Sequence, residues 1–305
     1  MRSTLYLTVA TLAISTGALQ AQEAGSLPRV QQLPASTRAM ALGNAYATTS
    51  RHADAVFYHP ALLSGASGFG IDVQRWGSEG DAAAMSAAFG WMGGTVGVGL
   101  QTLQFSGPGL GAAAAPAGQS HLFEAGGTPV SEAVTSVGFA RDLFGFDVGI
   151  VGKLAEERVG GSRSATVLFD AGIASDVGPM RAALSYRNLG SEHTLGGVDV
   201  ATPDQVTLGI GFYGQQIGFL DLGVNAALMY QGDELLPGGG VEFGYWPISG
   251  RTFVARVGAR RTLDDDMSPV TFGFAFWGDD VTLEWAFQPT DGEPSGTHRF
   301  GVRWR

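Results

Sequence analysis

The sequence predicts an all-β fold: a transmembrane antiparallel β-barrel of about fourteen strands with an N-terminal plug in its lumen. Three observations support this prediction. Apolar and polar residues alternate with a period of two from Gly68 onward, as in strands with one apolar and one polar face. Short and longer connections follow each other in strict order along the chain. The segment before Gly68 differs, because its apolar residues have helix-like spacing.

The first residues are typical of a secretory signal peptide. Met1 and Arg2 precede an apolar run from Leu5 to Ile14, and small residues follow as far as Ala21. We therefore expect a signal peptide over residues 1–21, a periplasmic and plug segment over 22–66, and the barrel over 67–305. After residue 22 there is no run of about 18 apolar residues, which excludes membrane-spanning helices.

The segment before the barrel holds two stretches of apolar clusters, 38–46 and 53–63. These clusters are too short, and too often interrupted by Gly or Pro, to form stable helices in isolation. They need a surface on which to bury their apolar side chains. We expect the inner wall of the barrel to supply it.

The strand pattern is clearest near the middle of the chain, where Val206, Leu208 and Ile210 alternate with polar or small residues. Each predicted strand is long enough to cross a bilayer at a tilt. The predicted strands cover residues 68–77, 81–91, 94–106, 131–142, 145–156, 162–175, 179–189, 204–214, 217–231, 238–247, 250–262, 268–277, 280–289 and 296–305.

The connections and the tryptophans indicate which end of the barrel is which. Tight connections such as Met92-Gly93 alternate with longer ones such as residues 107–130. Short periplasmic turns and longer extracellular loops are typical of outer-membrane barrels. Four tryptophans lie beside the short turns, where an interfacial aromatic girdle is expected, although each could instead be an ordinary core residue: Trp91, Trp246, Trp277 and Trp304.

Charged residues indicate which face of each strand meets lipid. They lie opposite the apolar row of their strand, as Asp72, Lys153 and Arg256 do. A Lys or Arg at the bilayer midplane on the lipid side costs roughly 2–4 kcal/mol, so the charged face must line the lumen. The same face is rich in glycine, which leaves space in the lumen for the plug.

The third predicted strand breaks the pattern. Its apolar phase slips at Gln101-Thr102, which we interpret as a β-bulge. Such a bulge is either an ordinary curvature feature or a lateral gate formed by Leu100, Gln101 and Thr102.

The composition argues against several other functions. The formal charge of −10 argues against a nucleic-acid-binding surface, and the lack of cysteine removes disulfides and thiolate chemistry. The five histidines are not at metal-ligand spacing, and no Ser-His arrangement is placed for catalysis. We expect no cofactor, no metal and no enzymatic activity. The acidic run at 263–267 could bind Ca²⁺ but is more commonly a solvated surface.

The segment Arg38-Ala-Met-Ala-Leu-Gly-Asn-Ala-Tyr46, followed by Ala53-Asp-Ala-Val-Phe-Tyr-His-Pro-Ala61, resembles the N-terminal signature of FadL-like outer-membrane proteins. His59 stands where that family usually has Asn. The resemblance implies a bacterial outer-membrane protein that carries a hydrophobic small molecule such as a fatty acid. Its implied plug or gating residues are Gly43, Asn44, Tyr46, Asp54, Phe57, His59 and Pro60.

Two alternatives remain at this point. The first is a non-transporting barrel of the PorV/PorQ kind, which would act as a scaffold or shuttle for proteins of a secretion system. The second is a soluble secreted β-sandwich used for adhesion. Under the barrel interpretation the partners are outer-membrane lipid and a hydrophobic ligand, or secretion-system proteins in the scaffold case.

Overall fold

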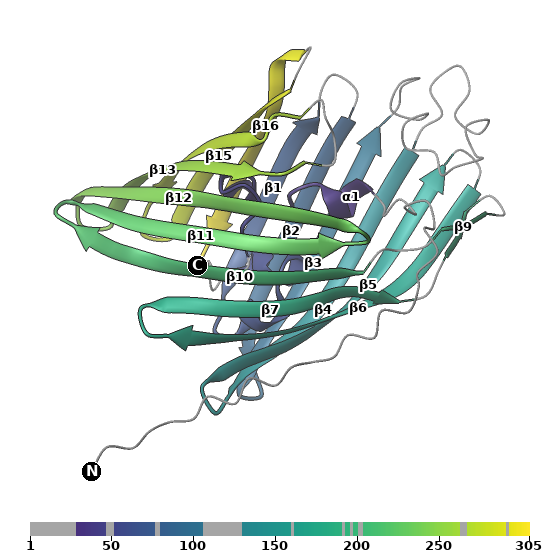
Figure 1. Cartoon of the computed structure of the whole chain (residues 1–305), viewed down its shortest axis with the longest axis horizontal. Coiled ribbons are helices and arrows are strands. Elements are labelled where there is room, and N and C mark those ends of the chain that lie inside the picture. Colours follow the sequence, from purple (N-terminus) through teal and green to yellow (C-terminus); the bar gives the residue numbers. More distant parts are fainter. Residues whose placement is uncertain are drawn as a thin grey trace.

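The computed structural model describes residues 29–46, 52–76, 80–105, 130–159, 162–190, 193–195, 198–200, 204–262, 267–290 and 293–305. Fourteen antiparallel strands within this part of the chain form a closed barrel, in which β1 pairs with β16 (Figure 1). The predicted barrel is therefore confirmed. The expected signal peptide, residues 1–21, and residues 263–266 of the acidic run lie outside the described ranges.

The barrel strands follow one another in sequence around the wall. They are β1 (Gly68–Trp76), β2 (Gly80–Trp91), β3 (Gly94–Phe105), β4 (Val130–Leu143), β5 (Phe146–Val159), β6 (Ser162–Val177), β7 (Met180–Gly190), β10 (Gln205–Ile217), β11 (Leu220–Gln231), β12 (Glu234–Ile248), β13 (Arg251–Arg260), β14 (Val270–Trp277), β15 (Val281–Thr290) and β16 (Glu293–Trp304). A separate two-stranded sheet, β8 (His193–Leu195) with β9 (Val198–Val200), lies in the connection from β7 to β10 and was not predicted.

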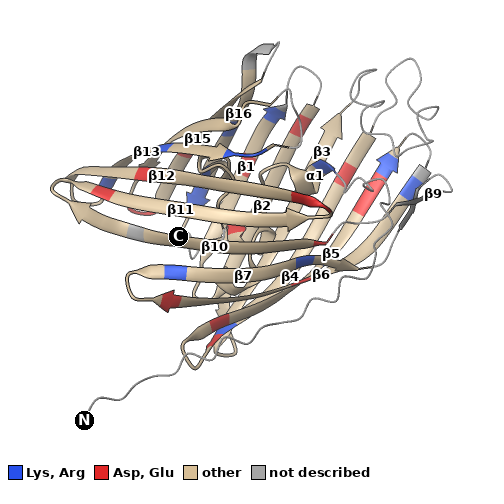
Figure 2. Ribbon diagram, in the orientation of Figure 1, with Lys and Arg blue, Asp and Glu red and all other residues tan. Residues whose placement is uncertain are grey.

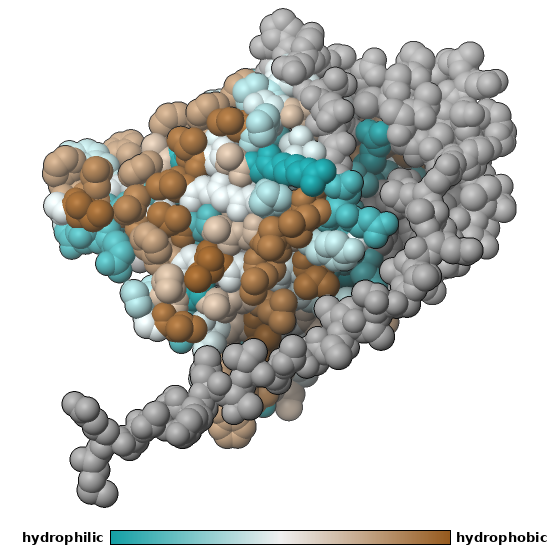
Figure 3. All heavy atoms as spheres, viewed as in Figure 1, coloured by the Kyte–Doolittle hydropathy of each residue, from teal (hydrophilic) through white to brown (hydrophobic). Residues whose placement is uncertain are grey.

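The outer face of the barrel is apolar. Ile150 on β5 and Phe274 on β14 are 65% and 60% exposed, and Leu208 on β10 is 56% exposed. Figure 3 shows such hydrophobic side chains gathered over the strands on the face in view. Most of the ribbon in Figure 2 carries no charged residue. Large apolar side chains exposed along whole strands are what a hydrocarbon environment requires. Among the described residues, no helix is long and apolar enough to cross a membrane.

The inner face carries the buried charges. Arg256 on β13 and Arg299 on β16 are each 1% exposed, and Lys153 on β5 is 4% exposed. Each has the phase opposite to the exposed apolar row of its strand, as the sequence predicted. The ordering of apolar and charged faces is therefore inverted relative to a soluble protein, with the ionised groups inside.

The predicted bulge in β3 was wrong. The register of β3 with both β2 and β4 is continuous through Gln101 and Thr102. Leu100 points outward, whereas Gln101, Leu103 and Phe105 are buried inside the barrel. The phase therefore does not slip. The inward residues change from polar to apolar towards the end of β3, and this change resembles a slip in the sequence.

The register shifts occur elsewhere. One lies between Phe169 and Ala171 of β6, opposite β7, where Asn188 adopts a positive φ of 63°. Others lie in β10, β12 and β15.

The tryptophan girdle also needs one correction. Trp91, Trp246 and Trp304 are exposed, but Trp277 has the inward phase of β14 and its ring centroid lies 6.0 Å from Cζ of Arg38.

Candidate functional site

Short helical elements lie inside the ring of strands, where Figure 1 labels α1. They are α1 (Arg29–Gln32), α2 (Thr37–Ala41), and the 3₁₀ turns η1 (Ala53–Phe57) and η2 (Pro60–Leu63). We call residues 29–46 and 52–66 the lumenal segment. Helix α2 packs on β13 to β16, while η1 and η2 pack on β1 to β6. Helices of four or five residues are not stable alone, so the barrel wall stabilises them.

Inward glycines make room for the lumenal segment. A Cβ at Gly149 would lie 2.4 Å from the backbone of Pro60, and one at Gly258 would lie 2.2 Å from the backbone nitrogen of Gly43. A Cβ at Gly172 would lie 2.8 Å from the His59 ring. These distances are far below van der Waals contact. The backbone of the segment therefore approaches the wall at places that only glycine permits.

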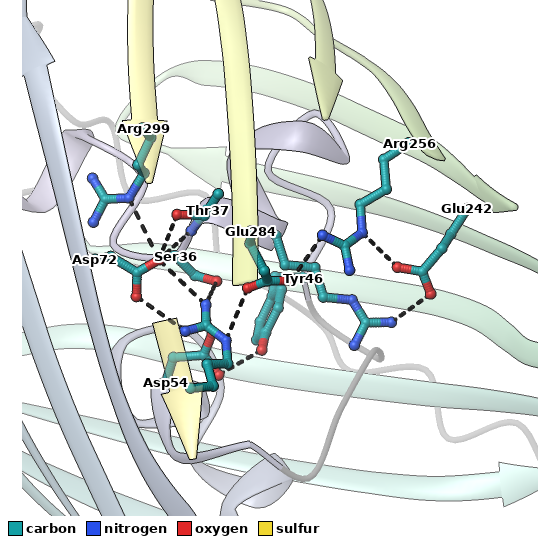
Figure 4. Close-up of polar contacts among 11 residues, drawn as sticks. Ser36, Thr37, Tyr46, Asp54, Asp72, Glu242, Arg256, Glu284 and Arg299 are labelled. Atoms are coloured by element: carbon teal, nitrogen blue, oxygen red, sulfur yellow. Dashed lines mark hydrogen bonds and ion pairs between the residues drawn. The ribbon is translucent and has the colours of Figure 1, made fainter. Parts of the chain in front are cut away.

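Arg303 of β16 is the centre of a buried ion-pair network on one side of the lumen. Figure 4 shows its partners Asp54, Asp72 and Glu284. Its guanidinium lies 3.0 Å from Asp54 of η1, 3.1 Å from Asp72 of β1 and 3.0 Å from Glu284 of β15. It also donates a hydrogen bond of 2.8 Å to Ser36 Oγ. One arginine thus connects three barrel strands to two parts of the lumenal segment.

Asp72 holds the start of α2. Its Oδ1 accepts hydrogen bonds from the backbone nitrogen and the hydroxyl of Thr37, at 2.7 and 2.6 Å. The first backbone N–H groups of a helix have no partner within the helix, and a negative charge there is favourable. The barrel wall therefore supplies the N-terminal cap that Ser36 does not make with its own side chain.

A second part of the network fixes Arg38. Arg38 lies 2.8 Å from Glu242 of β12, and Arg256 of β13 bridges Glu242 at 2.6 Å and Glu284 at 2.8 Å. Together with Arg299, the network contains equal numbers of arginines and carboxylates: Arg38, Arg256, Arg299 and Arg303 with Asp54, Asp72, Glu242 and Glu284. Balanced and mutually paired charges are the condition under which burying so many ions is tolerated.

Asp54 is ionised within this network. Burial by itself would raise its pKa, but Arg303, His52 and hydrogen bonds from Ser36 and Tyr46 together hold the pKa of the Asp54 carboxyl below its usual value. The Tyr46 hydroxyl donates to Asp54 Oδ1 at 2.6 Å. Two of the predicted plug residues are thus in direct contact.

On the opposite side of the lumen, the lumenal segment is held mainly by apolar contacts. Phe57, Leu62 and Leu63 are buried against alanines and Val151 on the inner face of the wall. One polar contact adds to this packing, because Arg187 of β7 donates a hydrogen bond of 2.7 Å to the carbonyl oxygen of Phe57. The lumenal segment is therefore held by ion pairs on one wall and by hydrophobic contacts on the other.

The remaining predicted plug residues occupy defined positions. Gly43 and Asn44 both have positive φ, 62° and 59°, where α2 ends. The Asn44 backbone nitrogen donates to Ala39 O at 2.8 Å, which closes the helix. His59 is fully buried, and burial followed by the charge of Arg187 lowers its pKa to about 4. Pro60 starts η2, where its missing N–H is harmless.

A buried apolar cluster lines the wall towards the longer-loop end. It contains Leu103, Phe105, Val130, Val134, Val159 and Leu168, and Val30 of α1 packs on it. Gln101 donates to Val30 O at 3.3 Å, and the Glu132 carboxylate accepts from the Val30 nitrogen at 2.7 Å. The residues proposed as a gate therefore lie apart from the Tyr46–Asp54 pair, and Gln101 contacts α1.

Sequence reasoning missed several residues of this site. The lumenal segment is anchored by Thr37, Arg38 and Ser36. The sequence predicted only that charged strand residues face the lumen, and did not pair these three with Asp72, Glu242 and Arg303. The inward phase of those charges was visible, but their partners lie more than 30 residues away in sequence. Within the part of the chain that the structure describes, no group of His, Cys, Asp and Glu is arranged to hold a metal ion.

No protein-family model matches the chain, and no curated protein matches it in sequence. Solved structures with the same fold include the Pseudomonas putida toluene transporter TodX, at 12% identity and a TM-score of 0.55, covering 87% of this chain and 95% of that one. The Ralstonia pickettii toluene transporter TbuX has 12% identity and a TM-score of 0.56, covering 88% and 97%. The CymD monoaromatic hydrocarbon channel has 10% identity and a TM-score of 0.54, covering 84% and 92%. At such identities, the likeness shows the fold alone.

Proposed function

We propose that this protein lies in the bacterial outer membrane, that its lumenal segment plugs the barrel, and that it passes or binds hydrophobic small molecules such as fatty acids. The FadL-like resemblance of residues 38–61 supports this proposal. So do the solved structures of the same fold, which are described as transporters of toluene or channels for monoaromatic hydrocarbons.

The apolar cluster on the inner wall carries the proposal. A channel for polar solutes is lined by polar side chains, whereas Leu103, Phe105 and Val134 line the lumen of this barrel towards the longer loops. Burial of apolar surface is the main source of affinity for a hydrophobic solute. A solute entering from the longer-loop end would meet this cluster together with Val30 of α1, which packs in it.

The lumenal segment stands across the direct route to the other end. It is fixed to both walls, by the Arg303 network on one and by Phe57, Leu62 and Leu63 on the other. Passage therefore requires either displacement of part of the segment or exit through the wall. We still propose an exit at Leu100, Gln101 and Thr102, although β3 lacks the bulge that first suggested it.

Uptake by whole cells tests the proposal. Bacteria that lack their own channel for the probe would express the wild-type protein or Leu103→Asn, and uptake of labelled fatty acid and labelled toluene would be measured. We expect the wild-type protein to raise uptake of one or both probes, and Leu103→Asn to reduce that gain. Val98→Asn, on the outward face of the same strand and outside the proposed exit, is the matched control for expression. Equal uptake with and without the protein would contradict the proposal.

The scaffold alternative predicts a different result from the same cells. A PorV/PorQ-type barrel would leave uptake of both probes unchanged and would co-purify with secreted proteins. Purification of the barrel from its native membrane, followed by identification of bound proteins, separates the two functions.

A further inference from the structure

A row of polar side chains marks one edge of the apolar outer surface. Cross-strand pairing places Arg163 of β6 beside Arg158 of β5, and Arg158 beside Ser131 of β4. The row continues through Gln104 of β3 to Asp81 of β2. All of these residues have the outward phase, and they lie towards the longer-loop ends of their strands.

The exposed apolar surface begins just below this row. Leu154 lies four residues from Arg158 on the same face of β5 and is 49% exposed. Val167 lies four residues from Arg163 on β6 and is 50% exposed, and Phe169 follows it at 56%. In a membrane barrel, such a change from apolar to polar side chains marks the level of the lipid headgroups. Arg158 and Arg163 therefore stand at that level, directly above hydrocarbon-facing side chains.

The two arginines are held together by one carboxylate. Arg158 Nε donates to Glu156 Oε1 at 2.6 Å, and Arg163 forms an ion pair with the other oxygen, Oε2, of the same group. The cluster of two cations and one anion has a net charge of +1. The arginine side chains remain 58% and 62% exposed. Each guanidinium has five N–H donors, and the contacts with Glu156 involve Nε and Nη2 of Arg158 and Nη2 of Arg163.

We infer that Arg158 and Arg163 form a binding site for the phosphate group of a membrane lipid in the leaflet on the longer-loop side. Two neighbouring guanidinium groups match the several acceptor oxygens of a phosphate, and such charge-assisted hydrogen bonds are the strong ones. The acyl chains of the same lipid would lie on Leu154, Val167 and Phe169. A free phosphate ion would gain only the polar half of these contacts. This inference rests on the proposed membrane location but not on the proposed transport function.

Binding of matched lipids to the detergent-purified protein tests the inference. Native mass spectrometry would compare phosphatidic acid with diacylglycerol of the same acyl chains, which lacks the phosphate. Inorganic phosphate forms a third arm. The test variant is the double substitution Arg158→Gln and Arg163→Gln. The control is Arg141→Gln with Arg251→Gln, which removes two exposed outward arginines at the short-turn end. The mobility shift on heating in gels verifies that each variant is a folded barrel.

We expect the wild-type protein and the control variant to bind phosphatidic acid in preference to diacylglycerol. The test variant should bind phosphatidic acid at least about tenfold more weakly, the factor expected for loss of one charge-assisted hydrogen bond. Three results would overturn the inference: equal binding of the two lipids, equal loss in both double variants, or binding of inorganic phosphate as tight as that of the lipid.

Discussion

The Tyr46 hydroxyl and the Asp54 carboxylate, joined by a 2.6 Å hydrogen bond, connect the two parts of the lumenal segment. The other oxygen of the same carboxylate lies 3.0 Å from Arg303 of β16. Asp54 therefore links residues 52–66 of the lumenal segment both to residues 29–46 and to the barrel wall. Because the group is 1% exposed, loss of either partner is not compensated by water.

Replacement of Arg303 by Gln should destabilise the protein strongly. It would leave Asp54, Asp72 and Glu284 without their shared cation in a buried site, and breaking a buried ion pair in this way costs about 3–5 kcal/mol. Urea unfolding in detergent measures the change. Arg251→Gln is the control, since the Arg251–Asp279 pair is exposed and should contribute no more than about 1 kcal/mol. Similar losses in both variants would contradict the assigned role of the network.

Substitution of Gly258 by Ala should displace the lumenal segment. The new Cβ would lie 2.2 Å from the Gly43 nitrogen, so one of the two backbones must move. We expect increased cleavage of residues 38–46 by an added protease. Gly223→Ala is the matched control, because its Cβ would meet nothing closer than 3.6 Å. An unchanged cleavage pattern in Gly258→Ala would show that the close approach is not required.

Adjacent residues of β10 test which face meets lipid. Leu208 points outward and is 56% exposed, while Thr207 has the inward phase. An arginine at the midplane of the lipid face costs roughly 2–4 kcal/mol, so Leu208→Arg should lower the free energy of unfolding in lipid vesicles by about that amount. Thr207→Arg should cost less, because its charge would enter a lumen that already holds ions. A larger loss of stability in Thr207→Arg than in Leu208→Arg would contradict the assignment of Leu208 to the lipid-facing side.

His59 should make stability depend on pH. Its pKa is about 4 in the folded protein, because burial and then Arg187 and Arg181 disfavour the charged ring, and about 6.5 when unfolded. The unfolded state therefore binds more protons between these values. The contribution of His59 is fully present above pH 6.5 and is lost as the pH falls towards 4, on the order of 3 kcal/mol in total.

Thermal unfolding of wild-type protein and His59→Asn across pH 4 to 7 measures this effect. The loss of stability on acidification should be smaller in His59→Asn. Part of it will remain, because His52 also has a pKa of about 4, owing mainly to burial. Parallel curves for the two proteins would show that protonation of His59 is not linked to folding.

Much of the barrel could be predicted from the sequence because each strand carries its own evidence. The phase of Leu208 against Thr207, for example, is set by which neighbour meets hydrocarbon, and it requires no knowledge of distant residues. The ends of strands followed from Gly-containing turns such as Met92-Gly93, where both residues adopt positive φ. The inward position of Arg256 and Lys153 followed from the cost of charge in lipid.

The features that sequence reasoning missed depend on contacts between distant segments. Leu103 and Phe105 keep the inward phase of β3. Their apolar side chains pack with Val30, more than 70 residues earlier, and that relationship leaves no local pattern. The register shift at Asn188 occurs where the Asn188 nitrogen donates to Asp170 on the neighbouring strand, at 2.9 Å. Trp277 was placed with the other short-turn tryptophans by position alone, although its phase pointed inward.

The closure of β16 against β1 has a consequence for the order of assembly. Arg299 and Arg303 stand on the strand that seals the wall, and they contact Ala35, Ser36 and Asp54 near the beginning of the chain. The interior therefore cannot settle into its final arrangement until the last seam has been joined. Packing of the lumenal segment is therefore coupled to closure of the barrel. A barrel in which β16 had not paired with β1 would lack these contacts to the lumenal segment.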